Sequence, residues 1–205
     1  EHIEKHSDLN VLVVVERLGM EQLRKEAPVA QAWREAGNPP PLTLTRVEWL
    51  GSADIFPMEY ADILAHHKVL AGTLPLDGVR VDMKDFRLQL EHEAMSKLLR
   101  LRHAVLATGG DVAAQQDLLE RSVSTMMVLV RAMLRLLGEE PAADSEAACA
   151  RAAERSGVDL APVLRIVRHL RAKEPMTKAE VPVVLERYLI TVGALASYID
   201  ARVVG

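Results

Sequence analysis

The residues with the clearest capacity for chemistry stand near the start of the chain, where a polar step leads into an apolar run. The run is Ser7-Asp8-Leu9-Asn10-Val11-Leu12-Val13-Val14-Val15, and its β-branched residues predict a buried strand. Asp8 and Asn10 are two residues apart, so on a strand their side chains share one face. A carboxylate and a second oxygen ligand on one face can bind a hard cation such as Mg²⁺. Both residues could instead serve only as turn formers at the end of the strand.

Composition limits the classes of protein to which the chain could belong. It has 205 residues, a net charge of -4 and only 3% aromatic residues, so its apolar content favours helices over an aromatic-rich β-sandwich. The acidic balance makes nucleic acid an unlikely partner. Cys149 is the only cysteine, which excludes a disulfide within the chain and agrees with a cytoplasmic location. We find no apolar run of the length that a membrane span needs, and expect no membrane partner.

The first part of the chain is predicted to be mixed α/β. After the first strand, apolar spacing predicts a helix over 20–36 that ends at Gly37-Asn38. Alternation predicts a short strand over 42–45, and Thr45 with Glu48 matches a capping box that opens one helical turn. A second long strand is expected over 56–64 and a short one over 79–83.

From about Asp85 the pattern changes to long helices. Apolar residues at three-and-four spacing predict helices over 86–107, 112–137 and 145–156, and two more that begin after Asp159 and Thr177. We expect an antiparallel helical bundle. The sequence therefore predicts two domains, 1–84 and 85–205, and an α+β fold in which a mixed sheet with helices precedes the bundle.

The order of these elements, together with Asp8-x-Asn10 and the run Asp54-Ile55-Phe56-Pro57-Met58-Glu59-Tyr60-Ala61-Asp62-Ile63, resembles the nucleotidyltransferase superfamily of the DNA polymerase β type. The chain is most similar to bacterial two-domain members with a helical C-terminal domain, such as aminoglycoside nucleotidyltransferases. The resemblance implies that paired acids on the strand bind Mg²⁺ and a nucleoside triphosphate is the substrate. It implies transfer of a nucleoside monophosphate to a hydroxyl of a small molecule or a protein.

Two departures from the family pattern concern the metal site and the triphosphate site. Asn10 stands where the family has its second acid, so the site would carry less charge than two dications require. The family's Gly-Ser turn is missing before Asp8, and we expect it upstream of Glu1; Leu50-Gly51-Ser52 is interpreted as a chance match. An alternative function is therefore a catalytically degenerate protein of this fold that binds a nucleotide or a partner.

The resemblance also implies a third carboxylate on a neighbouring strand. Glu59 and Asp62 are the candidates, and because they are three residues apart they would face opposite sides of a strand. That parity does not decide which face meets Asp8. Glu59 is preferred because it is central in the expected strand and matches the family's placement better, as a third metal ligand or as the base for the acceptor hydroxyl.

Other polar and apolar groupings have simpler interpretations. The adjacent His66 and His67 are interpreted as surface residues, and a polar face around Lys97 as a solvated face. A basic cluster on one helix is either a solvated face or a phosphate contact; it comprises Arg165, Arg168, His169, Arg171 and Lys173. The row formed by Met126, Val130, Met133 and Leu137 is expected to be covered by other helices or by a second copy, which allows a homodimer through the helical domain.

Overall fold

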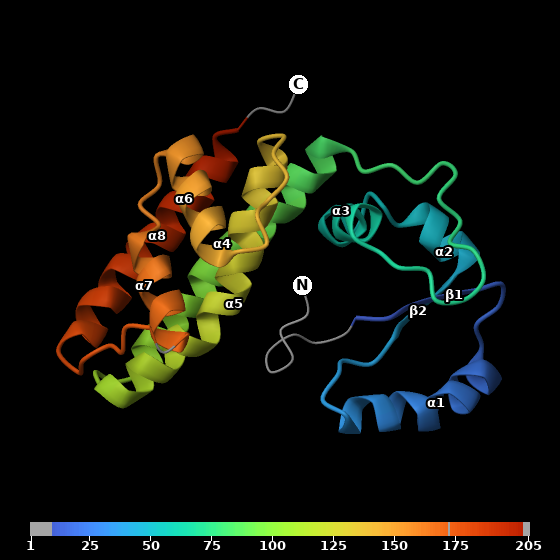
Figure 1. Cartoon of the computed structure of the whole chain (residues 1–205), viewed down its shortest axis with the longest axis horizontal. Coiled ribbons are helices and arrows are strands. Elements are labelled where there is room, and N and C mark those ends of the chain that lie inside the picture. Colours follow the sequence, from blue (N-terminus) through green and yellow to red (C-terminus); the bar gives the residue numbers. More distant parts are fainter. Residues whose placement is uncertain (1–9, 172, 203–205) are drawn as a thin grey trace. The chain divides into compact units, whose positions relative to one another are not determined.

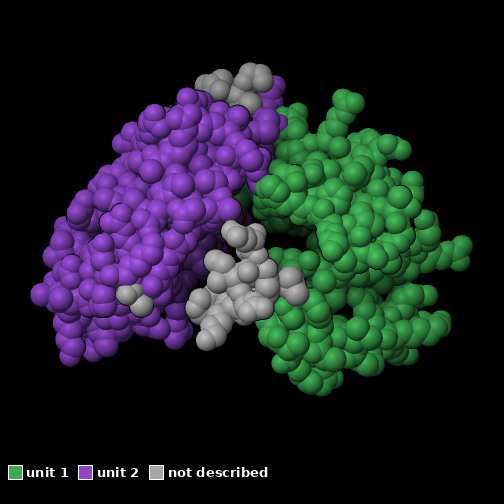
Figure 2. Space-filling view, in the orientation of Figure 1, with its two compact units in different colours: residues 1–82 green, residues 83–205 purple. Residues whose placement is uncertain are grey.

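The computed structural model describes residues 10–171 and 173–202, which divide into two compact units. Unit 1 comprises residues 1–82 and unit 2 residues 83–205, and Figure 2 colours them separately. The elements are labelled in Figure 1. The protein is an α+β structure with a small parallel sheet in unit 1 and helices in both units.

Unit 1 is built on a β-α-β segment. Strand β1 (Leu12–Val15) is followed by α1 (Met20–Glu35), and β2 (Leu42–Thr45) then pairs with β1 in parallel, with Leu12 opposite Leu42. The Pro39-Pro40-Pro41 segment leads directly into β2. The described residues form no other strand, so the sheet is parallel, and the expectation of a mixed sheet is wrong in this respect.

One face of the sheet carries the core of unit 1. Leu12, Val14 and Leu44, which alternate along the strands, pack against Trp49 on α2 (Arg46–Gly51). The Trp49 ring stacks on Tyr60, with ring centroids 4.4 Å apart. The Trp49 Nε1–H donates to the carbonyl oxygen of Pro75 at 2.6 Å, and the Tyr60 hydroxyl donates to the carbonyl oxygen of Trp49 at 2.7 Å. These two bonds fix α2, the following helix and the 72–82 segment to the same side of the sheet.

Two predicted strands of unit 1 do not form. Residues 57–65 are helix α3 (Pro57–Ala65), which starts with a proline in its first turn, where the missing N–H is tolerated. Tyr60, Ile63 and Leu64 recur at helical spacing and pack into the core, so the segment follows a period of three and four and the expectation of a strand is wrong. The 79–83 segment is not a strand either: Val79 is buried in a loop, and Met83 begins the next helix.

Unit 2 is entirely helical among the residues that the structure describes. Its helices are α4 (Met83–Ala107), α5 (Val112–Leu136), α6 (Ser145–Ser156), α7 (Ala161–Leu170) and α8 (Glu180–Asp200). The predicted cap of α5 forms: Asp111 accepts from the Ala114 N–H at 2.7 Å. Glu180 accepts from the Thr177 N–H at 2.7 Å, as the capping box predicts, but α8 begins at Glu180 and its N-cap residue is Ala179. Gly157 ends α6 with a φ of 72°, a conformation that favours glycine.

The core of unit 2 forms where α5 packs against α4, α6, α7 and α8. Met126, Val130 and Met133 are fully buried there, so of the two expected coverings of this row, by other helices or by a second copy, these residues have the first. Helix α8 has the length and composition of a membrane span, contrary to our expectation from the sequence. Its Val181, Tyr188 and Val192 side chains are buried in this core.

Candidate functional site

The candidate site lies at the start of β1. Asp8 falls outside the described residues, whereas Asn10 is described, exposed, and two residues ahead of β1. The Leu42 N–H donates to the Val11 carbonyl oxygen at 2.9 Å, which extends the pairing of the two chain segments to the residue next to Asn10. If the alternation of Leu12 and Val14 continued beyond β1, Asn10 would lie on the side of the sheet that packs against α2 and α3.

Helix α3 brings the two candidate carboxylates onto the same side of the sheet. Glu59 and Asp62 are exposed and three residues apart, so on a helix they share a face. The strand-based argument that set them on opposite sides is therefore wrong, because the segment is helical. Since Tyr60, Ile63 and Leu64 anchor α3 to the sheet, both carboxylates belong to a well-packed element.

The donors in this part of unit 1 suit a hard cation. An amide oxygen from Asn10 and carboxylates from Glu59 and Asp62 are the ligand types that Mg²⁺ accepts. Within the described parts of the chain, no three His, Cys, Asp or Glu side chains are grouped closely enough to hold a metal ion. Asp8 lies outside the described residues, so a Mg²⁺ site that includes it stays a prediction, supported only by the oxygen donors of these side chains.

The opposite end of the sheet is occupied by structural hydrogen bonds. At the carboxyl end of β2, both the N–H and the hydroxyl of Thr45 donate to Glu48, at 2.7 Å and 2.8 Å, which completes the predicted capping box. These bonds hold the pKa of Glu48 below its usual value, through the Thr45 N–H first and the hydroxyl second. The Ser52 hydroxyl donates to the Glu48 carbonyl oxygen at 2.7 Å, so the Gly51-Ser52 pair ends a helix.

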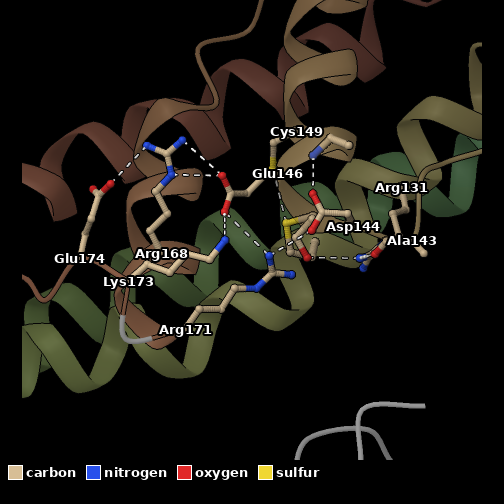
Figure 3. A network of polar contacts seen from close by, with 12 residues as sticks. Arg131, Ala143, Asp144, Glu146, Cys149, Arg168, Arg171, Lys173 and Glu174 are labelled. Atoms are coloured by element: carbon tan, nitrogen blue, oxygen red, sulfur yellow. Dashed lines mark hydrogen bonds and ion pairs between the residues drawn. The ribbon is translucent and has the colours of Figure 1, made fainter. Parts of the chain in front are cut away.

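The basic cluster of unit 2 is neutralised by carboxylates (Figure 3). Glu146, near the start of α6, forms ion pairs with this cluster. Its Oε2 lies 3.3 Å from Arg168 Nη2, and its Oε1 lies 3.0 Å from Lys173 Nζ. Arg171 Nη1 lies 3.0 Å from Asp144 Oδ1. The hydrogen bond from Lys173 is the main cause that lowers the pKa of Glu146. Because these cations already have acidic neighbours, the network favours a structural tie between α6 and α7 over a phosphate or RNA contact.

Both ring nitrogens of His169, from the same cluster, have hydrogen-bond partners. Its Nδ1 accepts from the Met176 N–H at 3.0 Å, so that nitrogen carries no proton. Its Nε2 therefore carries the proton and donates to Glu120 Oε1 at 3.1 Å. Both ring nitrogens are occupied, which leaves neither available as a catalytic base.

In unit 1, His66 and His67 are exposed, as expected, and His67 Nδ1 lies 2.7 Å from the Ile63 carbonyl oxygen.

Lys97 is buried, so the expectation that it lies on a solvated face is wrong. Its side chain donates to the Ser122 carbonyl oxygen and to the Thr125 hydroxyl, both at 2.6 Å, and the residue is 6% exposed. Burial, with a smaller contribution from Arg100, lowers the pKa of Lys97 to about 8. The spacing of Leu90, Ala94, Lys97 and Leu101 could have revealed this, since it sets Lys97 within the apolar stripe.

Comparisons with protein-family models, with curated proteins and with solved structures gave no match for this chain.

Proposed function

We propose that unit 1 is a nucleotidyltransferase-like domain that binds a nucleoside triphosphate with Mg²⁺ and transfers a nucleoside monophosphate to a hydroxyl of a small molecule or a protein. The observation that carries the proposal is the juxtaposition within unit 1. Asn10, two residues after Asp8 in the sequence, precedes a strand whose inner side packs on the helix that carries Glu59 and Asp62. Oxygen ligands from these two elements suit one cation.

Each residue of the proposed site has a distinct part. Asp8 supplies the principal carboxylate ligand, and Asn10 supplies a neutral ligand through its amide oxygen. Glu59 is either the third ligand or the base that takes the proton of the acceptor hydroxyl. The hydroxyl oxygen then bonds to the α-phosphorus as the bond to pyrophosphate breaks. Bound Mg²⁺ would neutralise the charge that develops on the phosphate oxygens.

A second candidate function is a degenerate member of this fold that binds a nucleotide or a partner without turnover. Asn10 is the observation that favours it, because the amide carries no charge where the resembling family has an acid. A site with fewer carboxylates attracts divalent cations less strongly. The two functions share binding and differ in turnover, so one assay with both readouts separates them.

The test combines nucleotide binding with pyrophosphate release in the presence of acceptor alcohols. Asp8→Ala is expected to lose Mg²⁺-dependent binding of nucleoside triphosphate and any release. The matched control is Glu16→Gln, at the carboxyl end of the same strand, which should retain both. Binding without release in the wild type would favour the degenerate member. Equal binding by wild type and Asp8→Ala would contradict the proposed site.

The amide at position 10 offers a gain-of-function test. Asn10→Asp restores the missing charge, so it should tighten Mg²⁺ binding and raise transfer if Asn10 is a ligand. Asn10→Ala should weaken both. Equal Mg²⁺ affinity in the wild type, Asn10→Asp and Asn10→Ala would exclude Asn10 as a ligand. Asn10 would then be only a residue that precedes the strand.

A further inference from the structure

Helix α4 carries an exposed apolar stripe on the face that does not enter the core of unit 2. Leu88, Met95, Leu99 and Leu106 are 54%, 46%, 48% and 79% exposed, respectively. The residues at 88, 92, 95, 99, 102 and 106 are alternately four and three residues apart, which is the spacing of a coiled-coil seam. The stripe extends over roughly 27 Å, from the helical rise of about 1.5 Å per residue.

The pattern of apolar and nitrogen-bearing residues along this seam is the same in both directions, although the individual residues differ. It begins and ends with leucine, has basic His92 and Arg102 one step inward, and has Met95 and Leu99 at the centre. A second copy of α4 laid antiparallel would therefore set Leu88 against Leu106 and Met95 against Leu99. Such a contact uses the same surface on both copies, as a two-fold dimer requires.

The charges beside the seam favour the antiparallel direction. The acids of α4, Asp85, Glu91 and Glu93, all lie in its first half, and no acid follows Glu93 before the helix ends. Arg102 and His103 lie in the second half, are exposed, and make no ion pair or side-chain hydrogen bond among the described residues. An antiparallel second copy would bring these cations to Glu91 and Glu93, which already pair with Arg87 and Arg100 of their own helix, whereas a parallel one would set Arg102 against Arg102.

We propose that the exposed stripe of α4 is the interface for a second copy of this chain, which pairs antiparallel along the seam from Leu88 to Leu106. The surface differs from the α5 row considered in the sequence analysis, because that row is buried within unit 2. The proposal does not depend on the chemistry of unit 1.

The mass of the full chain in solution tests this interface. The wild type should have twice the chain mass of 22.6 kDa, and Leu99→Glu should have the mass of one chain with an unchanged helical signal, because the side chain is exposed. Leu106→Glu provides a second variant with the same expected result. The control is Ile190→Glu, on α8 and 64% exposed, which should remain a dimer. A monomeric wild type, or a dimer that survives both α4 variants, would overturn the proposal.

A crosslinking experiment tests the direction. When tagged Leu88→Cys protein is mixed with untagged Leu106→Cys protein and oxidised, the expected product joins one chain of each kind. Products that join two copies of the same variant would overturn the antiparallel arrangement. Charge exchange gives an independent readout: Arg102→Glu should weaken the dimer, and adding Glu93→Arg should restore it. Failure of that restoration would contradict the assigned charge contacts.

Discussion

Unit 1 and unit 2 bury their apolar side chains by different means. Unit 1 depends on one stacked pair, Trp49 and Tyr60, which joins a two-stranded sheet to two short helices, and α1 has no buried residue. Unit 2 has long helices with aliphatic side chains that recur along every helix and meet in one core. The candidate site therefore lies in the unit with the smaller core. Mutations of Trp49 or Tyr60 should reduce the stability of this unit most.

The two units can be followed separately in solution. Trp33 and Trp49, the only tryptophans, both lie in unit 1, so tryptophan fluorescence reports on unit 1 alone. The long helices of unit 2 dominate the helical circular dichroism signal. Denaturation followed by both signals can reveal two transitions, in which case a single free energy of unfolding does not describe the chain.

The largest effect is expected for Trp49→Ala. This change removes the largest fully buried side chain of unit 1 and leaves the Pro75 carbonyl without its donor, so it should cost about 3–5 kcal/mol of the stability of unit 1. The Trp33 fluorescence should then report an unfolded unit 1, while the helical transition of unit 2 is unchanged. If Trp49→Ala abolishes the helical transition of unit 2 as well as the tryptophan transition of unit 1, the two units do not have independent cores.

The reciprocal change is Leu134→Ala in unit 2. Leu134 on α5 is 1% exposed, and truncation of such a side chain costs about 2–5 kcal/mol. The helical transition should move to lower denaturant concentration, and the tryptophan transition should stay in place. Val128→Ala, on the same helix and 50% exposed, is the matched control and should change neither transition.

A pH-dependent effect is expected for Lys97→Met. The pKa of Lys97 is about 8 in the folded protein and has an unperturbed value of 10.5, so the unfolded chain binds more protons between these pH values. The buried charge therefore destabilises unit 2 fully below pH 8, and this penalty is relieved as the pH rises to 10.5. Lys97→Met should be more stable than wild type at pH 7 by up to about 3 kcal/mol.

The stability difference between wild type and Lys97→Met is the quantity to measure. Cys149 and Tyr188, whose pKa values burial raises to about 11 and about 12, also affect stability at high pH, but they do so equally in both proteins. The difference should narrow as the pH rises from 8 to 10.5. A constant difference across that range would show that Lys97 is not a buried cation.

The smallest effect is expected for Thr45→Ala, which removes the cap of α2. The Thr45 hydroxyl accepts from the Glu48 N–H at 3.2 Å, and loss of such a cap costs about 1 kcal/mol. The tryptophan transition should shift slightly, and Thr45→Ser should restore it. No shift in Thr45→Ala would show that packing of Trp49 alone fixes α2.

The helices of unit 2 could be predicted closely, because long stripes at three-and-four spacing, with side-chain caps at the starts of α5 and α6, leave few alternatives. The capping box at Thr45 and the strands at Leu12–Val15 and Leu42–Thr45 were also predictable. Helix α3 was not, because a nine-residue segment has apolar residues that fit both periods, and its packing on the sheet decides between them. For the same reason, the shared face of Glu59 and Asp62 could not be derived from the sequence.

The measurement that most directly tests the central claim is the thermal unfolding of the full chain with a nucleoside triphosphate, with and without Mg²⁺, followed by both signals. A ligand of the native state raises the transition of the unit that binds it. We predict that the tryptophan-detected transition of unit 1 rises only when nucleotide and Mg²⁺ are both present, and that Asp8→Ala abolishes the rise. An unchanged tryptophan transition, or a rise confined to the helical signal of unit 2, would contradict a nucleotide site in unit 1.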